Sequence, residues 1–471
     1  MPILISIPDD CKPLADAIRH LIASVERIQR RAVGGRAVDY APVERDLGAR
    51  TAAIERAAHQ SLLAALDVDV PSVVIDGRRH TRVHRAEGRY YTLAGDVVVE
   101  RALYRAERNG PVVDAISLRA GVIAGGWLPE TATAMAHLLQ QGTSREAEAT
   151  GQRLGRVPYS HASFERVGHA VGAQYAGQKT AIDDALIVAL AIPVEARSVS
   201  VGIDRVSVPF EEPRPRPVGR PRRWAPRRPI QRVFRMAYCT TVTFHDARGE
   251  ALHTIRQGAI PSVPPADLCD RLMADALAIV QQRPDLDVVR LCDGAPEMRD
   301  LLREAVDAAT LGTRVDDLLD FWHVLEKLAP AAQVLYGEAR GAAVLATWRL
   351  DLLNRRAAVN DILAALTASG QRTVRIGTTR PVHEAITYLE NHREMLDYPG
   401  ALRRGLPIGS GNTEATCKTL FTVRMKRSGA RWREATAAHV IHLRALALSD
   451  RWEPALQLTL APLRKAVRVA A

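Results

Sequence analysis

Three acidic residues lie at points of the sequence where their side chains could share metal ions. Asp204 interrupts an apolar stretch, Asp293 ends another, and Glu414 follows a Gly-Ser-Gly-Asn turn. Carboxylate oxygens are the ligands that Mg²⁺ prefers. Two such ions about 4 Å apart activate an attacking oxygen and stabilise a leaving oxygen in phosphodiester chemistry. We therefore expect two Mg²⁺ or Mn²⁺ ions, with Asp204 bridging both, Asp293 binding one and Glu414 the other.

Each acid has an ordinary structural interpretation when it is taken singly. The two aspartates could end strands, and the glutamate could lie on an exposed helix face. Four other acids are near enough in sequence to replace one of the three, namely Asp320, Glu211, Glu212 and Glu297. Glu297 could also complement a helix dipole in a first turn. The order Asp, Asp, Glu on the predicted elements favours the first three.

Residues 198–323 predict a β-β-β-α-β-α-β order that would bring the acids to one sheet edge. Expected strands and helices cover 199–208, 235–244, 252–256, 265–282, 288–293, a short helix after Pro296, and 318–321. Three antiparallel strands followed by alternating helices and strands is an RNase H-like order, which gives an α/β class with a mixed sheet. Residues 324–404 are predicted as a helical insertion, and residues 405–450 as the last part of the core, an acidic and basic helix.

The N-terminal part is expected to be an α+β region that binds DNA. Within an N-terminal helical region, residues 1–70, residues 10–67 predict two amphipathic helices, and residues 71–197 predict β-hairpins followed by helices. Residues 143–167 resemble a helix-turn-helix whose second helix would offer Ser160, Ser163 and Arg166 to a groove. An ordinary helical hairpin fits that stretch equally well. Residues 451–471 are predicted as a C-terminal tail.

A basic loop, residues 212–232, interrupts the predicted sheet. It holds eight arginines, six prolines and one acid, so it supplies +7 of the chain's net charge of +11. Within it, Val218-Gly-Arg-Pro-Arg-Arg223 looks like an AT-hook core, which would place Arg220, Arg222 and Arg223 in a narrow minor groove. The alternative is a solvated linker that binds the phosphate backbone without sequence preference.

A second set of cations follows Glu414 and is predicted to hold the DNA strand being cut. Trp432 stands among them, and the alternative is a solvated helical face. The set consists of Lys418, Arg424, Lys426, Arg427, Arg431 and Arg433.

Four motifs resemble bacterial insertion-sequence transposases of the ISKra type, which are DDE enzymes. They begin at Val201, Leu291, Asp320 and Gly405 and read VGIDRVSVPFEEP, LCDGAP, DFWHVL and GLPIGSGNTEATCK. The resemblance covers roughly residues 70–455. It implies a DDE triad at Asp204, Asp293 and Glu414, and an accessory role for His323, which could also be a core histidine. Some relatives carry cysteine pairs in the N-terminal β region; this chain has none there, so a zinc-stabilised reader is not expected.

Composition agrees with a nucleic-acid partner. The pI of about 9.7 favours a polyanion, with DNA ahead of an anionic membrane surface. No stretch is long and apolar enough to predict a membrane span or a secretory signal. Five dispersed cysteines without a CxxC pair predict reduced thiols in a cytoplasmic protein, here at the bacterial nucleoid.

The sequence therefore predicts a metal-dependent DNA transposase that binds terminal inverted repeats and target DNA as a homo-oligomer. Two alternatives stay open. One is an RNase H-like nuclease or resolvase without strand transfer. The other is a non-catalytic DNA-binding regulator derived from a transposase. The 120 residues between Asp293 and Glu414 favour the transposase over compact nucleases.

Overall fold

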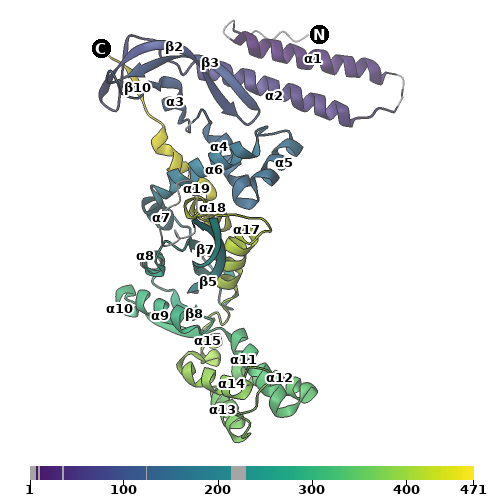
Figure 1. The fold of residues 1–471 in the computed structure, drawn as a ribbon, viewed down its shortest axis with the longest axis vertical. Coiled ribbons are helices and arrows are strands. Elements are labelled where there is room, and N and C mark those ends of the chain that lie inside the picture. Colours follow the sequence, from purple (N-terminus) through teal and green to yellow (C-terminus); the bar gives the residue numbers. More distant parts are fainter. Residues whose placement is uncertain are drawn as a thin grey trace, which may run out of the picture. The chain divides into compact units, whose positions relative to one another are not determined.

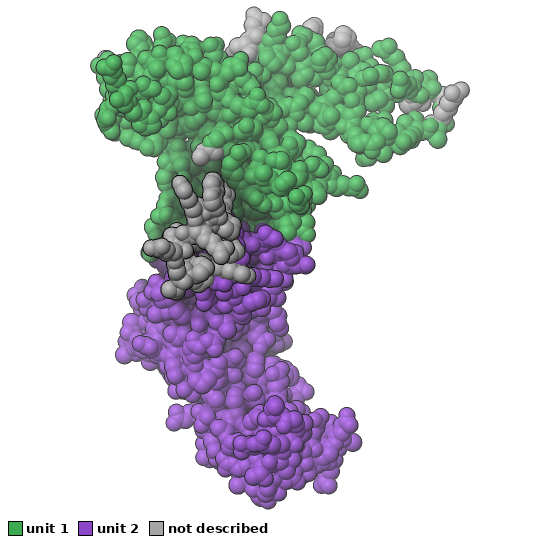
Figure 2. Space-filling view, in the orientation of Figure 1, with its two compact units in different colours: residues 1–182, 452–471 green, residues 183–451 purple. Residues whose placement is uncertain are grey.

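The computed structural model describes residues 7–8, 11–33, 35, 37–123, 125–213 and 230–470. The chain forms two compact units. Unit 1 comprises residues 1–182 and 452–471, and unit 2 comprises residues 183–451 (Figure 2). The protein is a mixed α/β chain with 54% helix and 21% strand, which confirms the class expected from the sequence.

Unit 1 begins with a helical hairpin. α1 (Lys12–Ala32) and α2 (Ala41–Ala64) lie side by side (Figure 1). Both helices start with proline in the first turn, where the missing amide hydrogen has no helical partner. Inside the hairpin the buried Ser24 hydroxyl donates to Asp46. The two predicted amphipathic helices are confirmed.

An antiparallel sheet forms the β part of unit 1, in the order β10-β1-β2-β3-β4. Its strands are β1 (Ser72–Ile75), β2 (Arg78–Thr92), β3 (Gly95–Arg105), β4 (Val113–Asp114) and β10 (Val467–Val469). β2 is a single strand with a register shift between Arg82 and His84. Such a bulge bends a strand without ending it.

The remaining helices of unit 1 are α3 (Ala115–Ala120), α4 (Pro129–Gln141), α5 (Ser144–Leu154), α6 (His161–Ala176) and the start of α7 (Lys179–Val188). Two of them, α4 and α6, cross closely. Gly168 on α6 faces Leu139 on α4 so closely that a Cβ would collide with the leucine. A capping box, Thr143 with Glu146, starts α5. Of the residues predicted to face a DNA groove, Ser160 and Arg166 are exposed and Ser163 is half-buried.

The last twenty residues belong to the fold of unit 1. α19 (Trp452–Leu460) packs on α6, and a short 3₁₀ turn, η4 (Ala461–Leu463), leads to β10. β10 pairs with β1 through Val73 and Val469. The segment predicted as a tail is thus an edge strand and a helix, and the long insertion of unit 2 separates it from the rest of unit 1.

A mixed sheet forms the centre of unit 2, in the order β7-β6-β5-β8-β9. Its strands are β5 (Ser198–Pro213), β6 (Ile230–His245), β7 (Ala251–Ala259), β8 (Asp287–Cys292) and β9 (Val315–Leu319). The first three strands are antiparallel to one another, whereas β8 and β9 run parallel to β5. β5 and β6 pair along their whole length, from Ser198–His245 to Pro213–Ile230, so both extend beyond the predicted strands.

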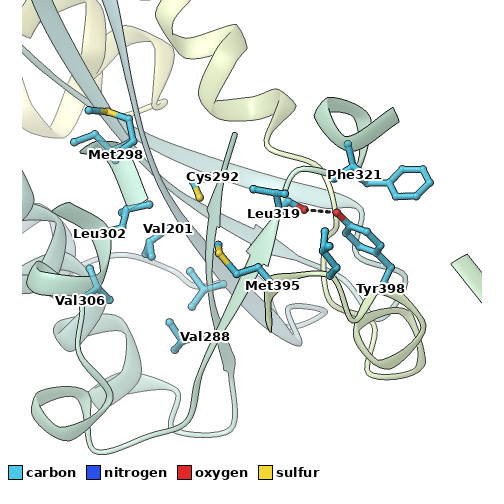
Figure 3. Packing of buried hydrophobic residues seen from close by; sticks show 14 of the residues in the cluster. Val201, Val288, Cys292, Met298, Leu302, Val306, Leu319, Phe321, Met395 and Tyr398 are labelled. Carbon is cyan, nitrogen blue, oxygen red and sulfur yellow. Dashed lines mark hydrogen bonds between the residues drawn. The ribbon is translucent and has the colours of Figure 1, made fainter. Parts of the chain in front are cut away.

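Alternation along β5 and β6 gives this sheet two buried faces. One face contributes Val199, Val201 and Ile203 to a core with α8 (Pro265–Gln282) and α9 (Pro296–Ala305). Figure 3 shows part of that core, where the Tyr398 hydroxyl donates to the Leu319 carbonyl at 3.1 Å. α8 has the predicted bounds.

A short helix, α10 (Ala308–Leu311), precedes β9, and the helical insertion follows β9. The helices of the insertion are α11 (Phe321–Tyr336), α12 (Glu338–Asn354), α13 (Ala358–Ala368), α14 (Pro381–Asn391), η2 (Arg393–Met395) and α15 (Tyr398–Arg403). The predicted strand at residues 318–321 ends at Leu319, because Asp320 instead caps α11. The helical insertion is otherwise confirmed.

The opposite face of the sheet is covered by the segment that carries Glu414. It comprises α16 (Gly411–Thr416), a π-helix η3 (Cys417–Thr422), α17 (Val423–Met425) and α18 (Glu434–Leu448). Leu420 and Phe421 of η3 pack there against Val208 and Phe210 of β5. The single acidic and basic helix expected here is wrong: residues 426–433 form no helix and connect α17 to α18. None of the described helices has both the length and the apolar composition needed to cross a bilayer.

Candidate active site

Asp204 lies in the middle of β5, on the face that η3 and α16 cover. Its neighbour across the sheet is Cys239 of β6. Gly202, two residues earlier on the same face, lets α16 approach, because a Cβ there would collide with the Thr413 hydroxyl. The Thr413 and Thr241 hydroxyls hydrogen-bond at 2.8 Å and are both buried. The glycine and the threonine pair therefore seat the Glu414 segment directly over the strand of the first acid.

Asp293 lies just beyond the end of β8, where the strand gives way to a tight turn. Its carboxylate accepts from the Ala295 amide at 2.9 Å, and Gly294 has φ +87°, which favours glycine. Two residues of the insertion hold this turn. The Tyr388 hydroxyl donates to the Asp293 carbonyl at 2.8 Å, and His392 Nε2 lies 3.1 Å from the Gly294 carbonyl. The insertion thus fixes the backbone that carries the second acid.

Glu414 lies in α16, immediately before the π-helix η3. Its carboxylate lies 3.2 Å from His323 Nε2 and 3.7 Å from the Lys418 ammonium. π-Helical turns within α-helical segments occur frequently at functional sites, because they change which residues share a face. Here the π-helix leaves Glu414 half-buried and Lys418 exposed at the same end of the segment.

His323 connects the start of the insertion to Glu414. Its Nδ1 lies 3.2 Å from the Asp320 carboxylate, which accepts from the Trp322 and His323 amides at 2.7 and 3.0 Å. The other oxygen of Asp320 accepts from both the amide and the hydroxyl of Ser410. Burial lowers the pKa of His323, but contact with Asp320 and the charges of Asp320 and Glu414 raise it more, so the net shift is upward. Asp320 is therefore a buried anchor, and His323 holds Glu414.

The three acids line one cleft of about 390 Å³, together with Arg205, Cys417 and Lys418. Residues 210 positions apart in sequence thus line one cleft beside the middle of β5 and the carboxyl end of β8, and open α/β sheets bind ligands at the carboxyl ends of their strands. Burial raises the pKa of Asp204, and the negative charge of Asp293 raises it further, although the Arg205 amide, the Cys417 thiol and the charge of His323 oppose this. The cleft therefore disfavours its own negative charge unless a cation is present.

Three carboxylates are suitable ligands for a divalent metal, but in this structure they do not surround a common point. Across the described ranges, no three His, Cys, Asp or Glu side chains stand close enough together to enclose a metal ion. Glu414 is turned toward His323, and Asp293 caps the Ala295 amide. The donor set is three carboxylates, which suits a hard cation such as Mg²⁺. Sharing an ion requires the Glu414 side chain to rotate away from His323.

The competing acids are occupied elsewhere. Glu297 pairs with Arg205 and accepts from the Tyr238 hydroxyl at 2.9 Å. Glu212 forms a two-pronged pair with Arg235 at 2.9 Å, and Glu211 lies 3.5 Å from Arg431. None of these acids lines the cleft of the three. A wider cleft of about 540 Å³, beside β9 and α15, is lined by arginines and acids that neutralise one another, such as Arg404 with Asp316 and Arg303 with Asp317.

The predicted DNA-binding cations divide into two groups. Lys418, Lys426, Arg431 and Arg433 are exposed, and Arg427 is half-buried. Arg424 is only 5% exposed, and its guanidinium stacks 4.6 Å from the centre of the Trp432 ring. Arg424 is thus buried against Trp432 and does not lie on an exposed helical face, whereas its contact with DNA stays a prediction. Arg220, Arg222 and Arg223 of the AT-hook-like sequence lie outside the described residues.

Sequence reasoning missed a pair of cysteines next to the first acid. Cys239 and Cys417 are both buried, with their sulfurs 3.3 Å apart, and the Cys417 thiol hydrogen-bonds to Asp204. Their separation of 178 positions gave no spacing signal. It missed Tyr388 and His392 for the same reason, since neither belongs to a local motif. Comparison with models of protein families gives no match, and no curated protein matches the chain.

Proposed function

We propose that the chain is a DDE transposase, which cuts DNA at the ends of an element and joins them to target DNA. The observation that carries the proposal is the convergence of Asp204, Asp293 and Glu414 on one cleft, from three separate elements. The strand order β7-β6-β5-β8-β9, with only β8 and β9 parallel to β5, supports an RNase H-like core.

The residues of the cleft have distinct roles in this proposal. Asp204, Asp293 and Glu414 would hold Mg²⁺ or Mn²⁺, and two bound ions supply activation of the attacking oxygen and stabilisation of the leaving one. His323 orients Glu414 and shields its charge before DNA is bound. Lys418, which lines the cleft, and Lys426 are exposed cations that would bind the phosphates of the strand being cut.

The proposed reaction determines which partners the chain must bind. DNA carrying terminal inverted repeats and target DNA are the substrates, and cutting two ends in concert requires at least two copies of the chain. The exposed face of α6, with Ser160 and Arg166, and the basic loop at residues 212–232 are the proposed contacts outside the cleft. Cytoplasmic residence at the nucleoid is part of the same proposal.

A non-catalytic DNA-binding protein is the second candidate, because one observation favours it. As placed, the three acids do not enclose an ion, and Glu414 is paired with His323. Against this, the insertion contacts the Asp293 turn with two side chains, which a binding protein would not require. The two candidates differ in one measurable property, which is cutting.

The test uses the purified full chain, Mg²⁺ and labelled DNA that carries the repeats flanking the gene. We expect cleavage at the element ends and joined products, both abolished by EDTA and restored by Mn²⁺. Cleavage without joining would indicate the nuclease. Tight binding without cleavage in either metal would indicate the regulator and overturn the proposal.

A further inference from the structure

An exposed tryptophan lies at the start of the insertion, beside the cleft. Trp322 is the second residue of α11 and keeps 53% of its surface exposed. No described residue accepts a hydrogen bond from its indole N–H. An indole buries a large apolar area when it is covered, so an uncovered one at a functional site marks a contact surface.

Arg349 of α12 adds a cation to this aromatic surface. Its guanidinium carbon lies 5.3 Å from the centre of a Trp322 ring, within cation–π range. Arg349 is exposed and forms no ion pair within the part of the chain that the structure describes. Trp322 and Arg349 together, which we name the Trp–Arg platform, thus offer a flat apolar face and an unneutralised positive charge.

The Trp–Arg platform contacts the residues that position the Glu414 side chain. The Trp322 amide donates to Asp320 at 2.7 Å, and the same carboxyl group holds Ser410, four residues before Glu414. A Cβ on Gly409 would lie 3.4 Å from the Trp322 ring, so the ring rests against the turn that leads into α16. His323, the next residue, contacts Glu414 directly.

We propose that the Trp–Arg platform binds an unpaired nucleotide of DNA next to the phosphate that is cut. The inference rests on the proposed function, because it assumes that DNA enters the cleft of the three acids. A base would stack on the indole, and the Arg349 guanidinium would meet the adjoining phosphate. Stacking of this kind accepts any base, because every base has a π face.

An unpaired nucleotide fits better than an intact duplex. Inside a duplex each base already stacks on its neighbours, so its faces are closed to a side chain. The end of a DNA duplex, or a base displaced at the cut, leaves one face open. The platform therefore contributes most when the DNA near the cut is frayed or mismatched.

The test measures stacking and cutting separately. The Asp293→Asn chain, which should bind without cutting, is titrated with repeat-end DNA that carries 2-aminopurine at successive positions around the cut. We expect fluorescence quenching at one or two positions beside the cut. Trp322→Ala in the same background should remove the quenching and weaken binding to frayed ends about ten-fold, with little change for fully paired DNA of equal length.

Three further variants isolate the platform from the fold. Trp322→Phe should restore most of the quenching, because an aromatic face remains. Arg349→Ala should weaken binding by a smaller factor and make it less dependent on salt. Leu350→Ala, a 61% exposed neighbour on α12, is the matched control and should change nothing.

The outcomes separate this inference from the proposed function. Unchanged quenching, unchanged binding and unchanged cutting in Trp322→Ala, while the parent chain cuts DNA, would overturn the platform alone. A chain that never cuts DNA, yet loses 2-aminopurine quenching in Trp322→Ala, would overturn the transposase and keep the platform as a binding site. Quenching by Trp322 at fully paired internal positions would contradict the preference for an unpaired base.

Discussion

Each of the two sheets carries an aspartate that is at least partly buried, Asp114 in unit 1 and Asp204 in unit 2, and the surroundings of the two differ. In unit 1, Asp114 is 6% exposed and accepts from Arg101 at 2.8 Å, from the Tyr90 hydroxyl at 3.0 Å and from Ser117. In unit 2, Asp204 has no ion-pair partner among the described side chains and faces the second carboxylate, Asp293. Asp114 is thus neutralised by the protein, whereas Asp204 is left to be neutralised by something else. An acid of the first kind maintains the fold, and one of the second kind indicates a binding site for a cation.

The largest effect expected from this comparison is on cutting. Asp204→Asn or Asp293→Asn should slow cleavage by at least about 1,000-fold, because each substitution removes a proposed metal ligand and its charge. DNA binding should stay nearly intact. For Asp204→Asn the thermal unfolding temperature should not fall, since the raised pKa of Asp204 means that its charged form is disfavoured in the folded protein. Cleavage assays, DNA titration and melting curves check the three statements; normal cutting by Asp293→Asn would show the triad to be misassigned.

The reverse pattern is expected at Asp114. Asp114→Asn removes the charge that compensates the partly buried Arg101 and should lower the free energy of unfolding of unit 1 by about 3 kcal/mol. Urea unfolding followed by fluorescence measures this. Adding Arg101→Met should recover part of the loss, because the unpaired cation is then absent. A stable Asp114→Asn chain that no longer cuts DNA would reverse the roles assigned to the two aspartates.

A buried histidine, His245, extends the comparison to a group that burial keeps neutral. His245 Nδ1 donates to the Gly249 carbonyl at 3.1 Å, and Nε2 accepts from Ser200 at 2.8 Å. Burial lowers its pKa to about 4. The unfolded chain binds this proton near pH 6.5 and the folded chain does not, so stability should fall by about 2 kcal/mol between pH 7 and pH 5. His245→Gln should flatten that slope in urea titrations; an unchanged slope would mean that another group causes it.

The smallest effect is expected at the clamp on the Asp293 turn. Tyr388→Phe removes one hydrogen bond to the Asp293 carbonyl, which is worth about 1 kcal/mol. We expect cutting to slow by about five-fold and the Mg²⁺ concentration for half-maximal rate to rise, with DNA affinity unchanged. Tyr336→Phe, on another helix of the insertion, is the matched control. Equal loss in both variants would indicate general destabilisation rather than positioning of Asp293.

The periodicity of apolar residues was sufficient to predict most helices and strands of unit 2. It did not predict how these elements pair and pack against one another. Apolar runs and alternation located α8, β8 and the core of β5, because local composition determines those elements. The full length of β5 and β6 was missed, since cross-strand pairing and the contact of Glu211 with the Trp432 backbone extend them. The C-terminal strand β10 was missed as well, because a three-residue strand has no pattern of its own.

The candidate site was predictable in its acids and not in their neighbours. Asp204, Asp293 and Glu414 each followed a recognisable local signal. The contacts of His323, Tyr388 and His392 depend on how the insertion folds back on the core, which spacing does not encode. Arg424 shows the converse error: a cluster of basic residues predicts exposure, but Trp432, eight positions later, takes this arginine into the interior.

The pairing of β10 with β1 has a consequence for how the protein is made. The edge strand that completes the sheet of unit 1 is translated only after all of residues 183–451 have been synthesised. A nascent chain therefore carries an open strand edge at Val73–Ile75 throughout synthesis of unit 2, and that edge is available to chaperones or to another nascent chain. Premature termination just before residue 467 would yield a complete set of candidate catalytic residues on a molecule whose N-terminal sheet lacks its final strand.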